Sequence, residues 1–354
     1  MRLPTRRSIR GLLCALVLMP SIAGAQSDIL LRLRSGSPLG DRGRIDSASG
    51  FLLKGVLGVG IIPFTGAGER LMWHPYKAAF RAGSIGSAGT QWDDPNVGFY
   101  TWAGGYNTIA LGLASFAMGY QSTALGSYSN ALGYTANADG TGAVAIGYRT
   151  TADADYSVAI GQRASTNGHA GAIVLSDGST TDSTQASANN QFTVRSAGGV
   201  RLFTNATMTV GVQVAAGGSS WAVISDRNRK SNFLPLDGEG LLTRLRDVPV
   251  SRWQYNDEVD RTTWHIGPMA QDFHAAFGLT ADDKTINMSD LDGVNLAAIE
   301  ALEARTARLR AHADSLSTEN ASLKARLTSV EAQQQALLSR LSALEKSAEL
   351  RKRD

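Results

Sequence analysis

The chain has 354 residues, of which 43% are hydrophobic and 18% charged, so it is long enough for two or three domains. Its formal net charge of +3 depends on four arginines within the first 25 residues, which contain no acidic residue. Without that segment the net charge would be −1. The rest of the chain therefore lacks the basic surplus typical of nucleic-acid-binding proteins, and we expect no nucleic-acid partner.

Residues 1–25 have the pattern of a secretory signal peptide. A basic segment precedes an apolar run over residues 12–19, and small residues follow at Ala23 and Ala25. This pattern predicts cleavage after Ala25. A membrane anchor is the weaker interpretation, because the apolar run is too short to cross about 30 Å of hydrocarbon. Cys14, the only cysteine, follows a bulky leucine, which argues against a lipoprotein signal. The mature protein is therefore predicted to be exported without disulfides, to the cell surface, the extracellular space or the periplasm.

Residues 26–100 are predicted to lead into a repeat region and to cap it. The apolar segment FLLKGVLGVGIIP (51–63) contains a lysine, and its glycines do not follow the G-x-G-x-x-G pattern. Neither a membrane span nor a nucleotide-binding loop is therefore expected there. In the segment GERLMWHPYKAAFRAG (68–83), we expect Trp73 and Phe80 to cover the open end of the first repeat.

A glycine recurs every seven residues between Gly105 and Gly168, except that Ala154 replaces one of them. An alanine stands two positions before each, apart from Thr166. A helix is disfavoured, because glycine costs about 1 kcal/mol relative to alanine at each such position. The pattern fits better to short strands with turns at the glycines, where φ would be positive. Two repeats would then form one coil, and successive coils would stack. Stability would then come from stacking and from neighbouring chains, with polar positions facing solvent: Gln121, Tyr128, Arg149 and Tyr156.

The segments STALG, SNALG, AVAIG and SVAIG resemble the Ser/Asn-x-Ala-Ile/Leu-Gly repeats of YadA-like trimeric adhesin heads. Over residues 101–175, this resemblance implies a left-handed parallel β-roll with three chains packed side by side. Two interpretations remain open: an adhesin with a host, matrix or surface glycan ligand, and a spacer with no ligand. Those adhesins end in membrane-spanning strands, whereas this sequence ends in AELRKRD, so we do not expect that mode of anchoring.

Alternating apolar and polar residues around Gly-Gly pairs predict a β-rich neck over residues 176–224. The motif SDRNRK follows at 225–230, then a Leu-rich helix, WQY, GPMAQDF and a long helix. Taken alone, the serine and aspartate are equally typical of a helix cap or turn. In this order the motifs resemble the intramolecular chaperone domain of phage tailspikes such as endosialidase, over residues 221–310. Members of that family trimerise their upstream stalk and then cut themselves at the serine.

The resemblance implies that Ser225 is the nucleophile and Lys230 its partner, within a chaperone and autoprotease domain at residues 225–294. A neutral lysine can accept the proton of a serine hydroxyl. Folding would have to lower the ordinary lysine pKa of about 10.4 by burial or by nearby cations. Two neighbouring arginines could contribute, although both are more simply surface charges. The cut bond is either Ile224–Ser225 or Ser225–Asp226, and the sequence does not decide between them.

His265, in WHIGPMAQDF, is a third candidate for acid–base chemistry. A histidine beside the apolar IGPM segment is more often a packed residue than a catalytic one. Its spacing from His274, nine residues further on, matches no metal-binding pattern. We therefore expect no metal and no cofactor.

Residues 295–350 have the heptad pattern of a coiled coil. One position of seven successive heptads is apolar: Leu302, Leu309, Leu316, Leu323, Val330, Leu337 and Leu344. The other is mixed: Ile299, Thr306, Ala313, Asn320, Leu327, Gln334, Leu341 and Ala348. The two interior amides are expected to fix register. Sequence rules alone allow a dimer, whereas both family resemblances favour a parallel homotrimer.

The predicted fold class is mainly β with a C-terminal α-helical coiled coil: a β-roll head, a β-rich neck, a small α+β chaperone domain and a trimeric stalk. The predicted function is that of an exported homotrimeric fibre or adhesin-like surface protein, whose C-terminal domain releases itself once by Ser-Lys autoproteolysis and has no external substrate. The alternative is a non-cleaving surface stalk with a permanent coiled coil. A secreted glycan hydrolase is disfavoured, because residues 26–220 offer no pair of acids suited to a cleft.

Overall fold

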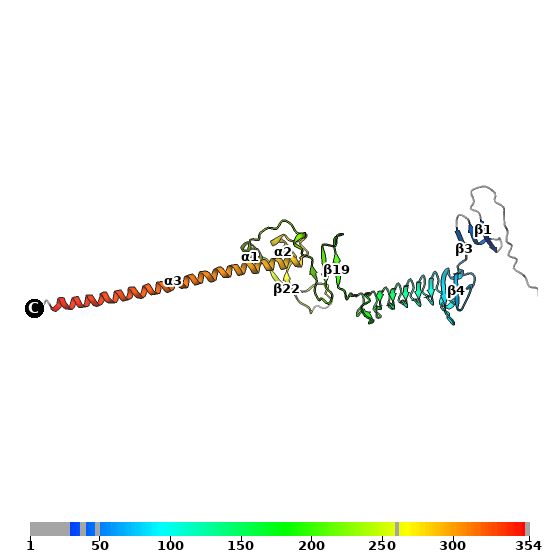
Figure 1. Cartoon of the computed structure of the whole chain (residues 1–354), viewed down its shortest axis with the longest axis horizontal. Coiled ribbons are helices and arrows are strands. Elements are labelled where there is room, and N and C mark those ends of the chain that lie inside the picture. The colour runs from blue at the N-terminus through cyan, green and yellow to red at the C-terminus, as the bar shows by residue number, and fades with distance from the viewer. Residues whose placement is uncertain (1–28, 36–39, 47–49, 259–261, 351–354) are drawn as a thin grey trace, which may run out of the picture. The chain divides into compact units, whose positions relative to one another are not determined.

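The computed structural model describes residues 29–35, 40–46, 50–258 and 262–350; the predicted signal peptide and Cys14 lie outside the described residues. The chain divides into two compact units, Met1–Ala222 and Val223–Asp354. The described part is mainly β, and its α-helices all belong to the second unit (Figure 1). None of the helices in the described part is long and apolar enough to span a membrane.

The first unit begins with an antiparallel sheet of three strands, β1 (Ile29–Ser35), β2 (Gly40–Asp46) and β3 (Gly50–Leu53). A hairpin follows, in which β4 (Gly68–His74) and β5 (Ala79–Ile85) are joined by the 3-10 turn η1 (Pro75–Lys77). A second 3-10 turn, η2, covers Asp94–Asn96. Strand β5 pairs in parallel with the first strand of the repeat region, so the hairpin extends the sheet of the repeats.

The repeats form a parallel β-roll over residues 102–176, as the sequence predicts. Long strands lie in a nine-stranded sheet that also contains β4 and β5: β6 (Trp102–Tyr106), β8 (Phe116–Tyr120), β10 (Asn130–Tyr134), β12 (Val144–Tyr148), β14 (Val158–Gln162), β16 (Ile173–Ser176) and β18 (Phe192–Arg195). Short strands form a six-stranded sheet: β7 (Ile109–Ala110), β9 (Thr123–Ala124), β11 (Asn137–Ala138), β13 (Thr151–Ala152), β15 (Ala164–Ser165) and β17 (Thr184–Gln185). Figure 1 shows the successive coils as a stack.

Alanine builds the core of the roll. Successive coils pair fourteen residues apart, so that Ala131 lies opposite Ala145 in the long-strand sheet and Ala138 opposite Ala152 in the short-strand sheet. These alanines are fully buried. A methyl group is the side chain that fits between two sheets wound so closely, and the repeated alanine therefore replaces the larger residues of an ordinary core.

The glycines serve a different purpose from the one predicted. Gly119 and Gly133 lie inside long strands rather than at turns, although their φ angles of 117° and 131° are positive. Gly126 lies beside a short strand and has no positive φ. At every one of these positions, a Cβ atom would lie 1.9–2.1 Å from a carbonyl oxygen of the next coil. Glycine is thus required mainly for close approach between coils.

The left-handed turns are formed by other residues, which corrects the prediction that glycines turn the chain. Two positions after most of the repeated glycines, and after Ala154, the backbone has φ between 49° and 62° at Asn107, Ala114, Gln121, Tyr128, Thr135, Arg149, Tyr156 and Arg163. After Gly140 the left-handed residue is itself a glycine, Gly142, with φ 65°. The four polar positions predicted to face solvent are among them and are exposed. A left-handed non-glycine residue is strained, so the hydrogen bonds of the stacked coils must hold these turns.

The N-terminal end of the roll is filled by Trp92, which is fully buried and donates Nε1 to the carbonyl oxygen of Thr108 at 2.9 Å. Trp73 and Phe80, predicted to cover this end, face each other across the β4–β5 hairpin and are only half-buried. Arg81 is fully buried beside them, and its guanidinium donates to three backbone carbonyls and a threonine hydroxyl. Burial lowers the pKa of Arg81 to about 10.

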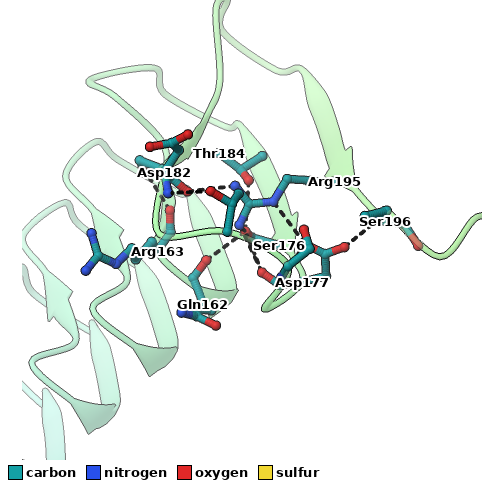
Figure 2. Close-up of polar contacts among 12 residues, drawn as sticks. Gln162, Arg163, Ser176, Asp177, Asp182, Thr184, Arg195 and Ser196 are labelled. Carbon is teal, nitrogen blue, oxygen red and sulfur yellow. Dashed lines mark hydrogen bonds and ion pairs between the residues drawn. The ribbon is translucent and has the colours of Figure 1, made fainter. Parts of the chain in front are cut away.

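The C-terminal end of the roll is closed by a polar network (Figure 2). The Arg195 guanidinium donates Nε to Asp177 Oδ1 at 3.0 Å, and Nη2 to Ser176 Oγ at 2.8 Å. Asp177 also accepts from the backbone N–H of Ala197 and from the Ser179 hydroxyl. These donors hold the pKa of Asp177 well below its usual range. The network thus anchors the irregular segment between β16 and β18.

The neck contains the antiparallel strands β19 (Val200–Phe203) and β20 (Gly211–Val214), followed by the short strand β21 (Ala222–Val223). The second unit contains the 3-10 turn η3 (Arg227–Arg229), helix α1 (Gly238–Arg246), the hairpin of β22 (Val250–Trp253) and β23 (His265–Pro268), helix α2 (Ala270–Phe277) and helix α3 (Met288–Leu350). Figure 1 shows α3 in orange to red.

Helix α3 begins at Met288, earlier than the heptad pattern indicates. Its first turns belong to the globular part of the second unit, where Leu241 of α1, Phe273 of α2, and Val294 and Ala298 of α3 form a buried cluster. Glu239 of α1 forms ion pairs with two arginines of α3, Arg305 and Arg308. The start of the helix is therefore fixed by packing against α1 and α2 rather than by heptads.

Candidate functional site

The structure brings the serine and lysine of the SDRNRK motif together. Lys230 Nζ donates a hydrogen bond to Ser225 Oγ at 2.6 Å. The two residues flank η3, whose three residues reverse the chain between them. Both side chains are exposed in the single chain, whereas Ile224 just before them is half-buried. The nucleophile, the proton acceptor and both candidate scissile bonds therefore belong to one short segment of the same chain.

Asp226 caps the turn that creates this proximity. Its carboxylate Oδ1 accepts from Asn228 N at 2.9 Å and from Asn228 Nδ2 at 3.1 Å. The backbone N–H groups of Arg229 and Lys230 donate back to Asp226 and Arg227, each at 3.1 Å. This is the ordinary capping role that an aspartate has at the start of a helical turn. This capping role agrees with the interpretation of the Ser-Asp pair, taken alone in the sequence, as a helix cap or turn.

The two arginines of the motif differ in their surroundings. The Arg227 guanidinium lies 5.2 Å above the Phe233 ring, in a cation–π contact, whereas Arg229 is exposed. A cation–π contact at an exposed site contributes about 0.5–1 kcal/mol. Arg227 therefore links the turn to the segment that follows it, and its side chain is directed to an aromatic ring.

His265 lies in a separate aromatic cluster. Its ring stacks on Trp253 at 4.6 Å between centroids, and its Nε2 lies 3.2 Å from Glu258 Oε1. Tyr255 contacts the same imidazole at 5.3 Å. The contacts described for His265 are with these residues and not with the Ser225–Lys230 pair. The surroundings are those of a packed histidine in the β22–β23 hairpin.

Two surfaces of the single chain expose apolar residues in regular rows. On the outer face of the long-strand sheet, Met118, Ile146 and Ile160 are 37–38% exposed. Four tyrosines stack beside them with ring centroids 5.0 Å apart: Tyr106, Tyr120, Tyr134 and Tyr148. Along α3, the apolar heptad residues from Leu302 to Leu344 are 45–68% exposed. Rows of this length are typical of surfaces that contact another chain.

Within the described ranges, no group of three or more histidine, cysteine, aspartate or glutamate side chains is arranged to hold a metal ion. The polar network of Asp177 and Arg195 was not found from sequence, because its residues are far apart along the chain and share no spacing pattern. The buried Trp92 was also missed, because nothing in the sequence distinguishes it from the neighbouring tryptophans.

Comparison with family models gives two matches. The YadA head domain repeat matches four overlapping segments, 103–129, 112–136, 128–150 and 138–164. The model described as chaperone of endosialidase matches residues 225–279, a segment that begins at Ser225 itself. The chain carries YadA-type head repeats and an endosialidase-type chaperone domain. Both resemblances found in the sequence are thereby confirmed.

No curated protein and no solved structure matches the chain. The two families are trimeric, which is consistent with self-association of this chain. The YadA-type head repeats are also in keeping with a protein of the cell surface or extracellular space.

Proposed function

We propose that the protein is an exported, parallel homotrimeric fibre of adhesin type, and that its chaperone domain aligns three chains and then releases itself by one cleavage beside Ser225. The observation that carries this proposal is the 2.6 Å contact between Lys230 Nζ and Ser225 Oγ within the segment matched as chaperone of endosialidase. The export step rests on the signal-peptide pattern of residues 1–25.

The cleavage can be written with the groups of this segment and one water molecule. The neutral amine of Lys230 accepts the proton of Ser225 Oγ, which attacks the carbonyl carbon of Ile224. As the C–N bond breaks, the lysine ammonium returns the proton to the leaving Ser225 nitrogen, and an ester links Ile224 to Oγ. Water then hydrolyses this ester, leaving a carboxylate on Ile224 and a free hydroxyl on Ser225.

The same geometry is less suited to the other bond. Attack of Oγ on the carbonyl of its own residue would close a strained β-lactone, so cleavage of Ser225–Asp226 would need an activated water molecule instead. We therefore favour Ile224–Ser225 as the cut bond. Assembly contributes by covering the exposed amine, because removal from water favours the uncharged form of a lysine.

Three chains are expected to associate through the long-strand sheets and through α3. Helix α3 presents leucine in one row of heptad positions, with Asn320 and Gln334 in the other. Polar residues at such positions lower stability but align the chains. Once the chaperone domain has been released, the fibre would be kinetically stable, since separated chains could not readily realign.

The second candidate function is a permanent trimeric stalk in which no cleavage occurs. It is favoured by the exposure of Ser225 and Lys230 to water in the single chain, because a serine nucleophile and its lysine partner are normally activated in a site that excludes water. In both cases the head either binds a host, matrix or surface glycan ligand or serves as a spacer.

The deciding experiment is the intact mass of the purified chain 26–354, beside the variants Ser225→Ala and Lys230→Ala, with oligomeric state determined by light scattering. Self-release predicts that the wild type splits beside residue 225, that both variants stay whole and that all three are trimeric. Ser231→Ala is the matched control and should split like the wild type. Full-length trimers of every variant would support the permanent stalk, and monomers would contradict both candidates.

A further inference from the structure

We propose that Asp226 is a positioning residue for the cleavage at Ser225. In this role its carboxylate holds the η3 turn in the shape that places Lys230 Nζ against Ser225 Oγ. This assignment deepens the proposed self-cleavage and rests on it.

The turn depends on Asp226 through its side chain and its backbone. Side-chain Oδ1 receives two hydrogen bonds from Asn228, and the carbonyl oxygen receives one from Arg229 N. Asp226 itself has an extended backbone, with φ −69° and ψ 124°, and the chain reverses immediately after it. Lys230 at the other end is again extended. The residue therefore lies at the point where the chain direction changes between nucleophile and amine.

Packing does not hold this turn in the single chain. Residues 225–230 are exposed, and η3 buries none of its side chains. A 3-10 turn of three residues has poor hydrogen-bond geometry and little stability of its own. Besides the backbone hydrogen bonds of the turn itself, the side-chain interactions that keep it closed are therefore the cap bonds of Asp226 and the contact of Arg227 with Phe233. If the turn opens, the separation of Oγ and Nζ exceeds the 2.6–3.2 Å or so that proton transfer requires.

The contacts of Asp226 distinguish positioning from direct proton transfer. Its Oδ1 is occupied by the two donors of Asn228. The hydrogen bond described for Ser225 Oγ joins it to Lys230, which donates, and not to the neighbouring carboxylate. Asp226 thus acts on the reaction through the conformation of the backbone. An uncharged side chain that accepts the same hydrogen bonds should therefore support cleavage equally well.

The test measures cleavage of newly made chains. Chain 26–354 is produced by cell-free translation with a pulse of labelled methionine, trimers are isolated, and the rate of cleavage is followed on denaturing gels over a range of pH. Asp226→Ala and Asp226→Gly remove the side-chain acceptor, whereas Asp226→Asn and Asp226→Ser retain one. Asp237→Ala is the matched control, because Asp237 precedes α1 without making a side-chain cap bond.

We expect cleavage to slow by about fivefold to thirtyfold in Asp226→Ala and by less in Asp226→Gly, because glycine is itself well tolerated at the start of a helical turn. Asp226→Asn and Asp226→Ser should stay within about threefold of the wild type, with an unchanged pH profile, because both residues cap helical turns well. Asp237→Ala should cleave as the wild type does. A residue needed only for folding would instead lower the yield of trimer and leave the rate in isolated trimers unchanged.

Two results would overturn the assignment. Wild-type rates in both Asp226→Ala and Asp226→Gly trimers would show that the cap is not needed. An equal loss in Asp226→Asn and Asp226→Ala, or a shifted pH profile in Asp226→Asn, would show that the charge matters rather than the cap. If the wild type itself does not cleave, the proposed self-release fails and this assignment fails with it; cleavage of the wild type with unaffected variants refutes the positioning role alone.

Discussion

Close approach between coils should make Gly126 far more sensitive to substitution than a glycine that merely has a positive φ. A Cβ at Gly126 would lie 1.9 Å from the carbonyl oxygen of Gly140, whereas real Cβ atoms stay at least 3.0 Å from their neighbours. The coils would therefore have to separate by about 1.1 Å at this point. Gly168 has φ 75° but nothing within 4 Å of its added Cβ, so it isolates the effect of backbone conformation.

The cost follows from the hydrogen bonds that would stretch. Leu125 N and Gly126 N both donate to Ala138 O, at 3.0 and 3.3 Å, and a separation of about 1.1 Å takes both beyond hydrogen-bonding distance. Each lost buried bond costs about 1–3 kcal/mol, so Gly126→Ala should destabilise the roll by about 3–5 kcal/mol. Gly168→Ala should cost about 1–2 kcal/mol, which is the ordinary penalty for a left-handed alanine.

Both variants would be made in the Ser225→Ala chain 26–354, so that cleavage does not mix two species. Thermal unfolding would be followed by the far-ultraviolet circular dichroism of the β-roll at one protein concentration. Gly126→Ala should unfold at a clearly lower temperature than Gly168→Ala. An equal or smaller shift for Gly126→Ala would refute the argument that the glycines are required for close approach.

The remaining predictions concern the ends of the roll and the cleavage site. Because the pKa of Asp177 is lower in the folded than in the unfolded state, the carboxylate stabilises the fold fully above the unfolded-state pKa of about 3.9, and this stabilisation is lost as pH falls further. In Asp177→Asn the thermal midpoint should therefore depend less on pH in the acid range. Trp92→Ala should cost about 3–5 kcal/mol in unfolding free energy, measured by denaturant titration, and Trp73→Ala clearly less. Co-expressed Ser225→Ala and Lys230→Ala chains should form mixed trimers that stay uncut, as judged by intact mass, because nucleophile and amine must belong to one chain.

Each of these predictions has an outcome that contradicts it. An unchanged acid dependence in Asp177→Asn would mean that other carboxylates determine the pH response. Equal effects of the two tryptophan substitutions would mean that Trp92 does not fill the end of the core. Cleaved chains in the mixed trimers would show that the serine of one chain uses the lysine of another.

The β-roll could be predicted from the sequence because its rule is local and repeated. Alanine at one position and glycine two places later, every seven residues, leaves few folds that bury the alanine and bring backbones together at the glycine. The turns were harder to predict, since a left-handed Gln121 or Arg149 carries no signature in a single sequence. Their conformation is imposed by the stacked coils rather than by their own preferences.

The candidate site could be predicted only in part from the sequence. A spacing of five residues does not by itself place a serine beside a lysine, and the family resemblance supplied that prediction. The physical cause is the single turn that Asp226 caps, which is visible only in the structure. The stacking of His265 on Trp253 also could not be derived, because it depends on the register of the β22–β23 hairpin across a connecting segment.

The fourteen-residue offset between coils has a consequence for the length of the molecule. Because Asn130–Tyr134 and Val144–Tyr148 pair with their neighbours in the same way, one coil can be removed or duplicated without changing the contacts that its neighbours make. Each added coil would lengthen the head by one strand spacing, about 4.8 Å. The number of coils therefore determines the length of the head in fixed steps. Because the coils are alike, three such heads could also associate with their registers shifted by one coil, unless a non-repeating element of the chain fixes the alignment.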